Sequence, residues 1–223
     1  MNPRVEFAPV NIKGKTGIDV VIHSEEATLA DYLSALEEYI ERGTYQRVRA
    51  ETGKCEGCDV CCQERVPLTS LDVLVLQKGL APGLPLGEFF KRFTNVCVSG
   101  PVVDITLARQ SDGKCIFLNR DTRRCLNYNE RPLVCRTYIC TPLTSRARKL
   151  RDAIVNTGED ELVRLWFRSS VKDGLVIHEA WDPEINEEDW LENAWTGKIT
   201  PQQVYLKDII PSSLWNELYK KGE

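Results

Sequence analysis

The sequence predicts an α+β fold that is mainly helical, with short β-hairpins and a cysteine-rich core stapled by metal. Short apolar-rich stretches between turn-forming residues indicate the strands, and apolar residues at helical spacing behind capping residues indicate the helices. Eight of the nine cysteines fall into two groups in the middle of the chain. Those two groups indicate where the core and its metal lie.

The N-terminal segment is predicted to form a hairpin and then a helix. Residues 5–12 and 18–23 are the strands, joined by the turn-forming stretch KGKTG. The helix that follows ends at Gly43, and Thr28 with Asp31 has the spacing of an N-terminal capping pair. One face of this helix carries four apolar residues: Leu29, Leu33, Leu36 and Ile40. We expect this segment to be scaffold.

Two further helices are predicted after the first cysteine group. The stretch LTSLDVLVLQKG forms a helix that Thr69 and Asp72 open and Gly79 stops. Prolines and glycines then break the chain before a second helix around Phe89 and Phe93.

A hairpin is predicted between the two cysteine groups. Residues 102–118 carry apolar residues on both sides of Asp112-Gly113, a dipeptide typical of hairpin turns. This turn would set Cys115 at the start of the returning strand. The ninth cysteine, Cys97, is flanked by valines, and we expect it to be a small buried apolar residue rather than a ligand.

The C-terminal region lacks cysteine and holds all five tryptophans. Helices are expected around four stretches: 150–154, 162–167, 190–195 and 201–207. Two helix starts are indicated by Asn186 with Asp189 and by Thr200 with Gln203. The main interpretation is that these helices pack their aromatic residues against the metal core, and the alternative is a tryptophan-lined ligand surface.

Length and charge limit the classes of function. The chain has 223 residues and a net charge of −4, so nothing in its overall charge suggests nucleic-acid binding. No apolar run approaches the roughly 20 residues that cross a bilayer, and the first residues lack the features of a signal peptide. We therefore expect a cytoplasmic protein of three segments: 1–52, the cysteine-cluster domain 53–143, and 144–223.

The first cysteine group is C-x2-C-x2-C-C. It consists of four residues: Cys55, Cys58, Cys61 and Cys62. Three thiolates spaced by two residues let a short loop curl around one inorganic centre, and bacterial-type ferredoxins use this spacing for a 4Fe–4S cluster. Side chains at consecutive positions diverge, so we expect Cys61 to join the primary set and Cys62 to face the distant cysteines.

The second group supplies widely spaced thiols. It consists of Cys115, Cys125, Cys135 and Cys140. In a reducing compartment, dense cysteines indicate metal binding or catalysis more often than disulfides, and an odd total fits a disulfide framework poorly. Metal binding by the combined set, reduced thiol chemistry and no special role all stay open. Soft thiolates suit both zinc and iron–sulfur clusters.

Three stretches resemble a known family. CEGCDVCC, VPLTSLDVLVL and CIFLNRDTRRCLNYNERPLVCRTY are similar to the YkgJ-type cysteine-cluster proteins, the CxxCxxCC family, over roughly residues 55–138. The resemblance implies zinc or iron chelation, and members are often labelled iron–sulfur oxidoreductases. Flagellin lysine methylases share the cysteine pattern. One departure is Asp59, where relatives often carry glycine.

The favoured function is therefore a metal-binding protein with a 4Fe–4S cluster and a role in electron transfer or in support of a redox or methyl-transfer reaction. A zinc-stapled adaptor without catalysis is the alternative, and a methylase is a second one. Whether the chain is an enzyme is left open, as is its redox or protein partner. Arg131 and Arg136 are predicted to offset the negative charge of the thiolate centre.

Overall fold

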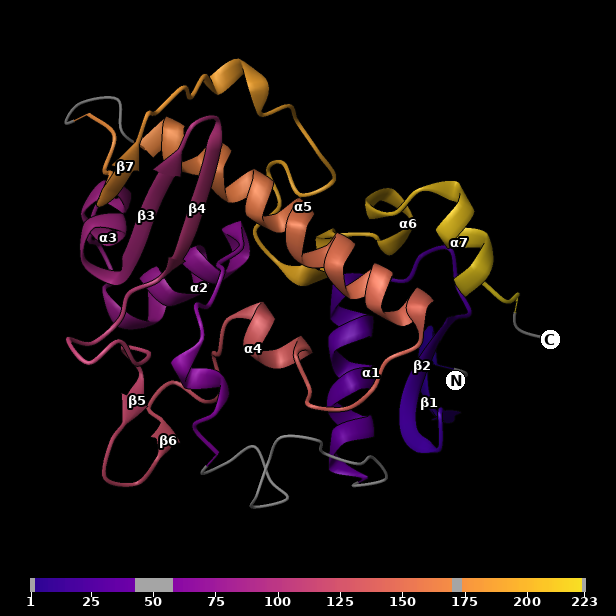
Figure 1. The fold of residues 1–223 in the computed structure, drawn as a ribbon. Helices are drawn as coiled ribbons and strands as arrows, with labels where there is room; N and C mark the ends of the chain where they lie inside the picture. Colours follow the sequence, from indigo (N-terminus) through magenta and orange to yellow (C-terminus); the bar gives the residue numbers. More distant parts are fainter. Residues whose placement is uncertain (1–2, 43–57, 170–173, 222–223) are drawn as a thin grey trace. The chain divides into compact units, whose positions relative to one another are not determined.

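The structure, a computed structural model, describes residues 3–42, 58–169 and 174–221. Its helices and small sheets confirm the α+β class (Figure 1). The predicted helix stop at Gly43 and the predicted ligand Cys55 lie outside the described residues. Within the described ranges, no helix combines the length and the apolar character that crossing a membrane requires.

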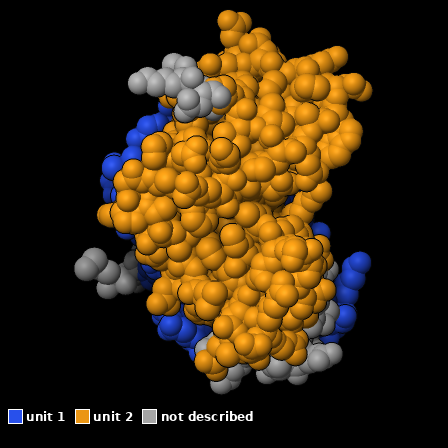
Figure 2. Space-filling view, turned by 90° about the vertical axis from the view of Figure 1, so that its left-hand side faces the viewer, with its two compact units in different colours: residues 1–49, 136–157, 193–223 blue, residues 50–135, 158–192 orange. Residues whose placement is uncertain are grey.

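The chain divides into two compact units, which Figure 2 colours separately. Unit 1 comprises residues 1–49, 136–157 and 193–223, and unit 2 comprises residues 50–135 and 158–192. The cysteine segment from the first group up to Cys135 therefore belongs to unit 2. Cys140 belongs to unit 1. The three-segment organisation drawn from the sequence stays a prediction.

Unit 1 begins with the predicted hairpin. Strand β1, Val5–Ile12, pairs antiparallel with β2, Lys15–Ile22. The turn between them is only two residues long, and both Lys13 and Gly14 have positive φ angles (52° and 79°). Two such residues make the tight turn whose twist matches that of the paired strands. The hairpin prediction is confirmed, with a shorter turn.

The predicted first helix is confirmed as α1, Leu29–Glu41. Thr28 and Asp31 form the reciprocal capping box that their spacing predicts, so two backbone N–H groups at the helix start are satisfied. The buried face differs from the prediction, because Tyr32 and Tyr39 are buried whereas Ile40 is only half-buried. Tyr32 packs edge-on against the ring of Phe7, with 5.2 Å between centroids, so α1 lies on the β1–β2 hairpin.

The long helix α5, Ser145–Ser169, replaces two of the predicted helices. The segments expected at 150–154 and 162–167 are parts of this one helix, which continues through Gly158. A single glycine in a helix interior costs only about 1 kcal/mol, and the buried residues on either side offset it. Residues 145–157 of α5 belong to unit 1 and residues 158–169 to unit 2.

The predicted helix at 190–195 is wrong. The 3-10 turn η2, Glu187–Asp189, precedes this stretch and begins at Asn186 as predicted. The side chain of Asn193 accepts a hydrogen bond from the N–H of Trp195 (2.8 Å), and Thr196 Oγ1 accepts one from the N–H of Asn193 (3.0 Å). Such side-chain bonds to the backbone compete with helical hydrogen bonding and hold the segment in turns.

The C-terminal part of unit 1 consists of three short elements. They are the 3-10 turn η3, Pro201–Gln203, and the helices α6, Leu206–Ile209, and α7, Ser212–Leu218. The helix start predicted at Thr200 is confirmed as a capping box with Gln203, but α7 was not predicted. Trp195 and Trp215 are buried in this unit, whereas the Trp181 side chain of unit 2 is exposed.

Unit 2 is built around a three-stranded sheet in the order β4–β3–β7 (Figure 1). β3, Thr94–Ser99, pairs antiparallel with β4, Val102–Leu107, and parallel with β7, Glu179–Trp181. The predicted helices are confirmed as α2, Ser70–Leu80, and α3, Leu86–Phe93. Thr69 and Asp72 form the predicted capping box of α2.

The hairpin predicted around Asp112-Gly113 is wrong, because β4 pairs with another strand. Its strand partner is the preceding β3, joined through a turn at Gly100, and not the segment that follows. The chain does turn at Gly113, but only the single bridge Arg109↔Cys115 closes that turn. Cys115 therefore lies in a short loop, not at the start of a strand.

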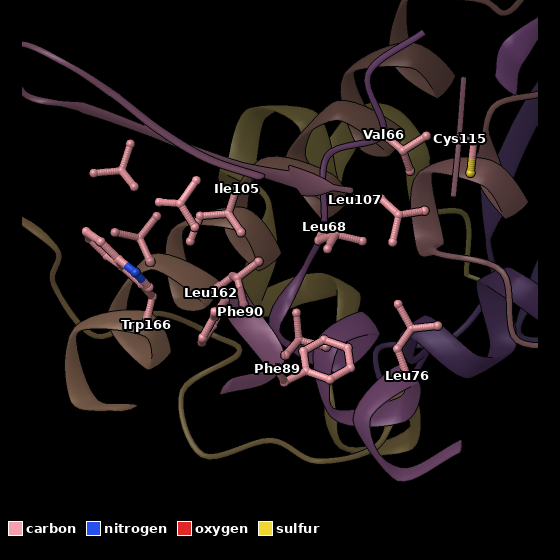
Figure 3. Packing of buried hydrophobic residues seen from close by; sticks show 14 of the residues in the cluster. Val66, Leu68, Leu76, Phe89, Phe90, Ile105, Leu107, Cys115, Leu162 and Trp166 are labelled. Atoms are coloured by element: carbon pink, nitrogen blue, oxygen red, sulfur yellow. The ribbon is translucent and has the colours of Figure 1, made fainter. Parts of the chain in front are cut away.

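The apolar core of unit 2 extends to the cysteines. Figure 3 shows Cys115 at one edge of a cluster that includes Leu68, Phe89, Ile105 and Trp166. Cys62, Cys125 and Cys135 also pack against this cluster. The side chain of Trp166 is fully buried in the same cluster. This packing agrees with the prediction that tryptophans of the C-terminal region pack against the cysteine-containing core.

A half-buried glutamate on α5 makes the stability of unit 2 dependent on pH. Burial raises the pKa of Glu159 to about 7 from an ordinary 4.5, and nearby carboxylates add to the effect. Because the folded pKa lies above the unfolded one, stability falls as pH rises from about 4.5 to about 7. We expect Glu159→Gln to stabilise the chain by about 1 kcal/mol at pH 8, after allowing for solvent screening, and to have no effect at pH 4.

Thermal unfolding at the two pH values measures this effect, and about 1 kcal/mol corresponds to a shift of roughly 2–4 °C. Glu184→Gln is the matched control, because Glu184 is an exposed glutamate of the same unit. Equal changes in melting temperature at pH 4 and pH 8 would refute the proposed role of Glu159.

Candidate metal centre

Four thiols of unit 2 share one environment. They are Cys62, Cys115, Cys125 and Cys135, and all four pack in or against the apolar cluster of this unit. Burial raises the pKa of Cys62 to about 12, and the charges of Cys115 and Cys125 raise it further. Burial also raises the pKa of Cys135, with added contributions from the same two cysteines. Cys115 and Cys125 therefore influence both Cys62 and Cys135.

Different elements bring these four thiols together. Cys62 lies in the 3-10 turn η1, Cys61–Gln63, and Cys125 ends the short strand β6, Arg124–Cys125. β6 pairs with β5, Leu118–Asn119, so that Cys125 lies opposite Leu118. Cys135 lies in the short helix α4, Leu133–Thr137. None of these elements is longer than five residues, so the surrounding contacts must position the sulfurs.

The backbone ties Cys115 directly to Cys62. The N–H of Cys115 donates to the carbonyl of Cys62 at 2.9 Å, which holds the two cysteine segments side by side. Backbone hydrogen bonds from Phe117 and Leu118 to the Cys115 sulfur favour its thiolate, although burial keeps the pKa of this thiol raised. Asn127 provides a similar backbone hydrogen bond for Cys125. N–H groups aimed at sulfur suit thiolates that bind metal.

Gln110 shapes the loop that carries Cys115, and no pattern in the sequence indicates this role. Its side-chain N–H groups donate to the carbonyls of Cys115 and Leu118, both at 2.9 Å. Its backbone N–H closes the turn by donating to the carbonyl of Lys114 at 2.7 Å. Gln110 thereby bonds to three carbonyl groups of this loop, and only the folded geometry identifies this role.

Asp72 positions α4 as well as capping α2. Its Oδ1 accepts a hydrogen bond from the N–H of Leu133 at 2.7 Å, while its Oδ2 accepts from Thr69. The side chain of Asp72 is buried, so these bonds are shielded from water. Leu133 begins α4, and Cys135 follows two residues later. The cap predicted from the sequence therefore also fixes the start of the helix that carries a thiol.

Asp59 pairs with basic residues that flank the distal cysteines. It accepts hydrogen bonds from Nε and Nη2 of Arg123, the former at 3.0 Å, and Lys114 Nζ lies 3.9 Å from its other oxygen. The Arg123 hydrogen bond holds the pKa of this carboxyl below its usual range. The carboxylate that the sequence places in the first cysteine group thus has cationic partners.

The two arginines predicted to balance charge lie in different surroundings. Arg131 lies over the ring of Tyr128, and its charge favours the thiolates of Cys125 and Cys135. Arg136 forms an ion pair with Glu37 of α1 in unit 1, with Nη2 and Oε1 2.6 Å apart. Arg131 thus acts on two of the four thiols, Cys125 and Cys135, and the charge-balancing roles of Arg131 and Arg136 stay predictions.

The other predicted ligands that the structure describes do not belong to the apolar cluster that the four thiols share. Cys58 is half-exposed and precedes η1, and Cys61 acts electrostatically on its neighbour Cys62. Cys140 lines an open groove of unit 1 together with Tyr138, Arg148 and Arg151. As ligands, Cys58, Cys61 and Cys140 stay predictions, as does Cys55.

Cys97 lies on β3, opposite Asp104 of β4 and Glu179 of β7. Besides its burial, the groups that shift its pKa are Glu179, Asp104 and Arg65, with no cysteine among them. The prediction that Cys97 is buried is wrong, because its side chain is only half-buried. Side chains alternate along the strand, and Val96 and Val98 are the ones that point into the core.

The donor set suits a soft metal centre. Four thiols with N–H groups near two of them fit zinc or an iron–sulfur cluster, whereas Mg²⁺ and Ca²⁺ require oxygen ligands. Over the described ranges, no three Cys, His, Asp or Glu side chains are arranged closely enough to hold a metal ion. The sulfurs are therefore neighbours that would have to draw together to bind one.

Comparison with known proteins assigns the same region. Residues 54–156 match the CxxCxxCC family model, which is described as "Putative zinc- or iron-chelating domain". The matched segment is 103 of the 223 residues of the chain. The resemblance predicted from the cysteine spacing is confirmed, and the domain contains all eight predicted ligands together with Asp59, Gln110 and Arg123.

Part of this chain is also similar in sequence to a curated protein. The chain is 32% identical over 82 residues to an uncharacterized protein of Methanocaldococcus jannaschii. The match covers 37% of this chain and spans 41% of the length of that relative. No solved structure matches the chain.

Proposed function

We propose that the CxxCxxCC domain of this chain binds its metal through thiolates, with Cys62, Cys115, Cys125 and Cys135 as one ligand set. The observation that carries this proposal is that the four thiols pack in or against one apolar cluster, with the N–H of Cys115 bonded to the carbonyl of Cys62. Burying several ionised thiols without a metal would be strongly unfavourable, because charges in an apolar core must be compensated. A bound cation supplies that compensation.

The proposed metal is iron in a 4Fe–4S cluster. The neighbouring cysteine group supports iron, because Cys55, Cys58 and Cys61 have the C-x2-C-x2-C spacing that ferredoxins use. These three cysteines form a separate predicted set from Cys62. Four thiolates on such a cluster in its oxidised form leave about two negative charges. Arg131, whose charge acts on Cys125 and Cys135, would offset part of them. When bound, the cluster would supply one-electron transfer, and the chain would serve a redox or methyl-transfer reaction.

A zinc-stapled adaptor is the second candidate, and one observation favours it. Cys62, Cys115, Cys125 and Cys135 come from short elements of unit 2 that have few contacts of their own. Four cysteines that close such elements around one ion are typical of structural zinc sites. In this case the metal contributes folding free energy and no catalysis.

Anaerobic purification with iron supplied distinguishes the two candidates. We expect a brown protein with iron and acid-labile sulfide in similar amounts, because all-cysteine ligation with ferredoxin-like spacing assembles such clusters. Metal analysis, sulfide determination and a visible spectrum of the same preparation measure this. A colourless protein with stoichiometric zinc would reject the cluster and support the adaptor. A chain without either metal would reject thiolate metal binding altogether.

A further inference from the structure

We propose that Asp59 and Arg123 form a positioning pair for the thiolate centre. The pair joins the first cysteine group to the segment that carries the distal cysteines, and Arg123 cancels a carboxylate charge beside Cys62. This inference rests on the proposed metal binding by Cys62, Cys115 and Cys125. It goes further, because it assigns a role to two residues that do not contact the metal.

The position of Asp59 makes it part of the cysteine turn. It lies between Cys58 and Cys61, and its backbone carbonyl accepts a hydrogen bond from the N–H of Cys62 at 3.0 Å. Only 7% of its surface is exposed. Asp59 holds Cys62 through its backbone carbonyl and Arg123 through its side chain, so a change in the side-chain contact can shift Cys62. Asp59 is therefore placed to set the position of that thiol.

The cationic partners of Asp59 flank both distal cysteines. Arg123 lies two residues before Cys125, and Lys114 directly precedes Cys115. Arg123 uses two of its nitrogens, Nε and Nη2, on the same carboxylate oxygen of Asp59, which fixes the direction of its side chain. One carboxylate thus joins the Cys62 turn to the two loops that bring up Cys115 and Cys125.

The backbone of Arg123 supports a specific use of its side chain. Its φ angle is 55°, in the left-handed region that glycine and asparagine favour. A long side chain at such a position costs about 1 kcal/mol or more and persists where surrounding contacts hold it. The ion pair with Asp59 is such a contact. We therefore infer that arginine is placed at this position for the contact of its guanidinium with Asp59.

Charge gives the pair a second effect that can be separated from its geometry. Asp59 lies three residues before Cys62 in the same turn, and its backbone carbonyl is hydrogen-bonded to the N–H of Cys62, so its carboxylate brings a negative charge near that thiol. While Arg123 is present, the carboxylate is compensated. Without Arg123, an uncompensated negative charge would lie beside a centre that is itself negative. Removal of Arg123 should therefore weaken metal binding more than removal of Asp59 does.

A double-mutant cycle on the full chain tests this order, with Zn²⁺ alone as the probe and a chromophoric chelator as competitor. We expect Arg123→Gln to weaken zinc binding about tenfold or more, in the range typical of residues that orient metal ligands. Asp59→Asn should weaken it less. In the Arg123→Gln background, Asp59→Asn should restore part of the lost affinity, because it removes the uncompensated charge.

Arg65→Gln is the matched control. Arg65 pairs with Asp104 at 3.5 Å in the same unit, and neither residue acts on any of the four thiols. Its zinc affinity should equal that of the unchanged chain. Thermal unfolding of each metal-free variant shows whether a loss of affinity merely reflects a loss of folding.

The outcomes separate the inference from the function on which it rests. Failure of the unchanged chain to bind zinc or iron would reject the proposed function and the inference together. Normal zinc affinity in Arg123→Gln would reject the positioning pair while the metal site stands. A double variant weaker than Arg123→Gln would reject the charge effect, because a purely geometric pair allows no rescue.

Discussion

Replacing Cys62 by serine is expected to remove one metal centre from the chain. Cys62 is the member of the first cysteine group that packs against the same apolar cluster as Cys115 and Cys125, and its carbonyl accepts the N–H of Cys115. A structural zinc site with four ligands provides roughly 10–16 kcal/mol, so one ligand accounts for about 3 kcal/mol, or about 100-fold in affinity. Metal content per chain and competitive titration measure the loss.

A set of related variants makes this expectation specific. Cys115→Ser should lower metal content by the same amount as Cys62→Ser, and the double variant should lose no more, because both thiols hold one centre. Cys97→Ser is the control and should leave metal content unchanged, since Cys97 lies between carboxylates on the sheet. Unchanged metal in Cys62→Ser, or losses that add in the double variant, would contradict the proposed ligand set.

Cys61→Ser tests the predicted division of the adjacent pair. We expect this variant to lose the set that Cys61 shares with Cys55 and Cys58, and to retain the centre that contains Cys62. Equal and complete loss of metal in the Cys61 and Cys62 variants would show one shared site and overturn the division.

Removal of the metal is expected to loosen the cysteine segments of unit 2 far more than α1. In the metal-free chain, several short elements lose the bonds to metal that close their loops, so these elements should open more readily. Amides such as Cys115 N–H and Leu126 N–H, which bond to Cys62 and Phe117, report on these segments. We expect their hydrogen exchange to accelerate about 100-fold or more, in line with a loss of at least 3 kcal/mol.

The amides of α1 provide the internal reference in the same experiment. This helix is held by its capping box and by packing on the β1–β2 hairpin, and neither contact involves a cysteine. Its exchange should change little between the two forms. Equal protection of Cys115 and Leu126 with and without metal would contradict a structural contribution of the metal to unit 2.

Local signals in the sequence were sufficient for much of the scaffold. The capping boxes at Thr28 and Thr69 and the β1–β2 hairpin were predicted correctly, because they depend on interactions within a few residues. The cysteine spacing was likewise sufficient to identify the CxxCxxCC domain. The errors arose where longer contacts decide the structure. The strand β4 pairs with β3 and not with the segment after Asp112-Gly113, and either partner satisfies the apolar pattern.

The sequence by itself determined the class of fold, the chemistry of the ligands and the expectation that Cys61 and Cys62 diverge. These properties follow from residue types and from spacing along the backbone. Only the tertiary structure decided which thiols share an environment, and that Asp59, Asp72 and Gln110 position the segments that carry them. Asp59 and Arg123 are 64 residues apart, and Asp72 and Leu133 are 61 residues apart. Contacts over such separations form only when the core folds, and no local pattern of residues encodes them.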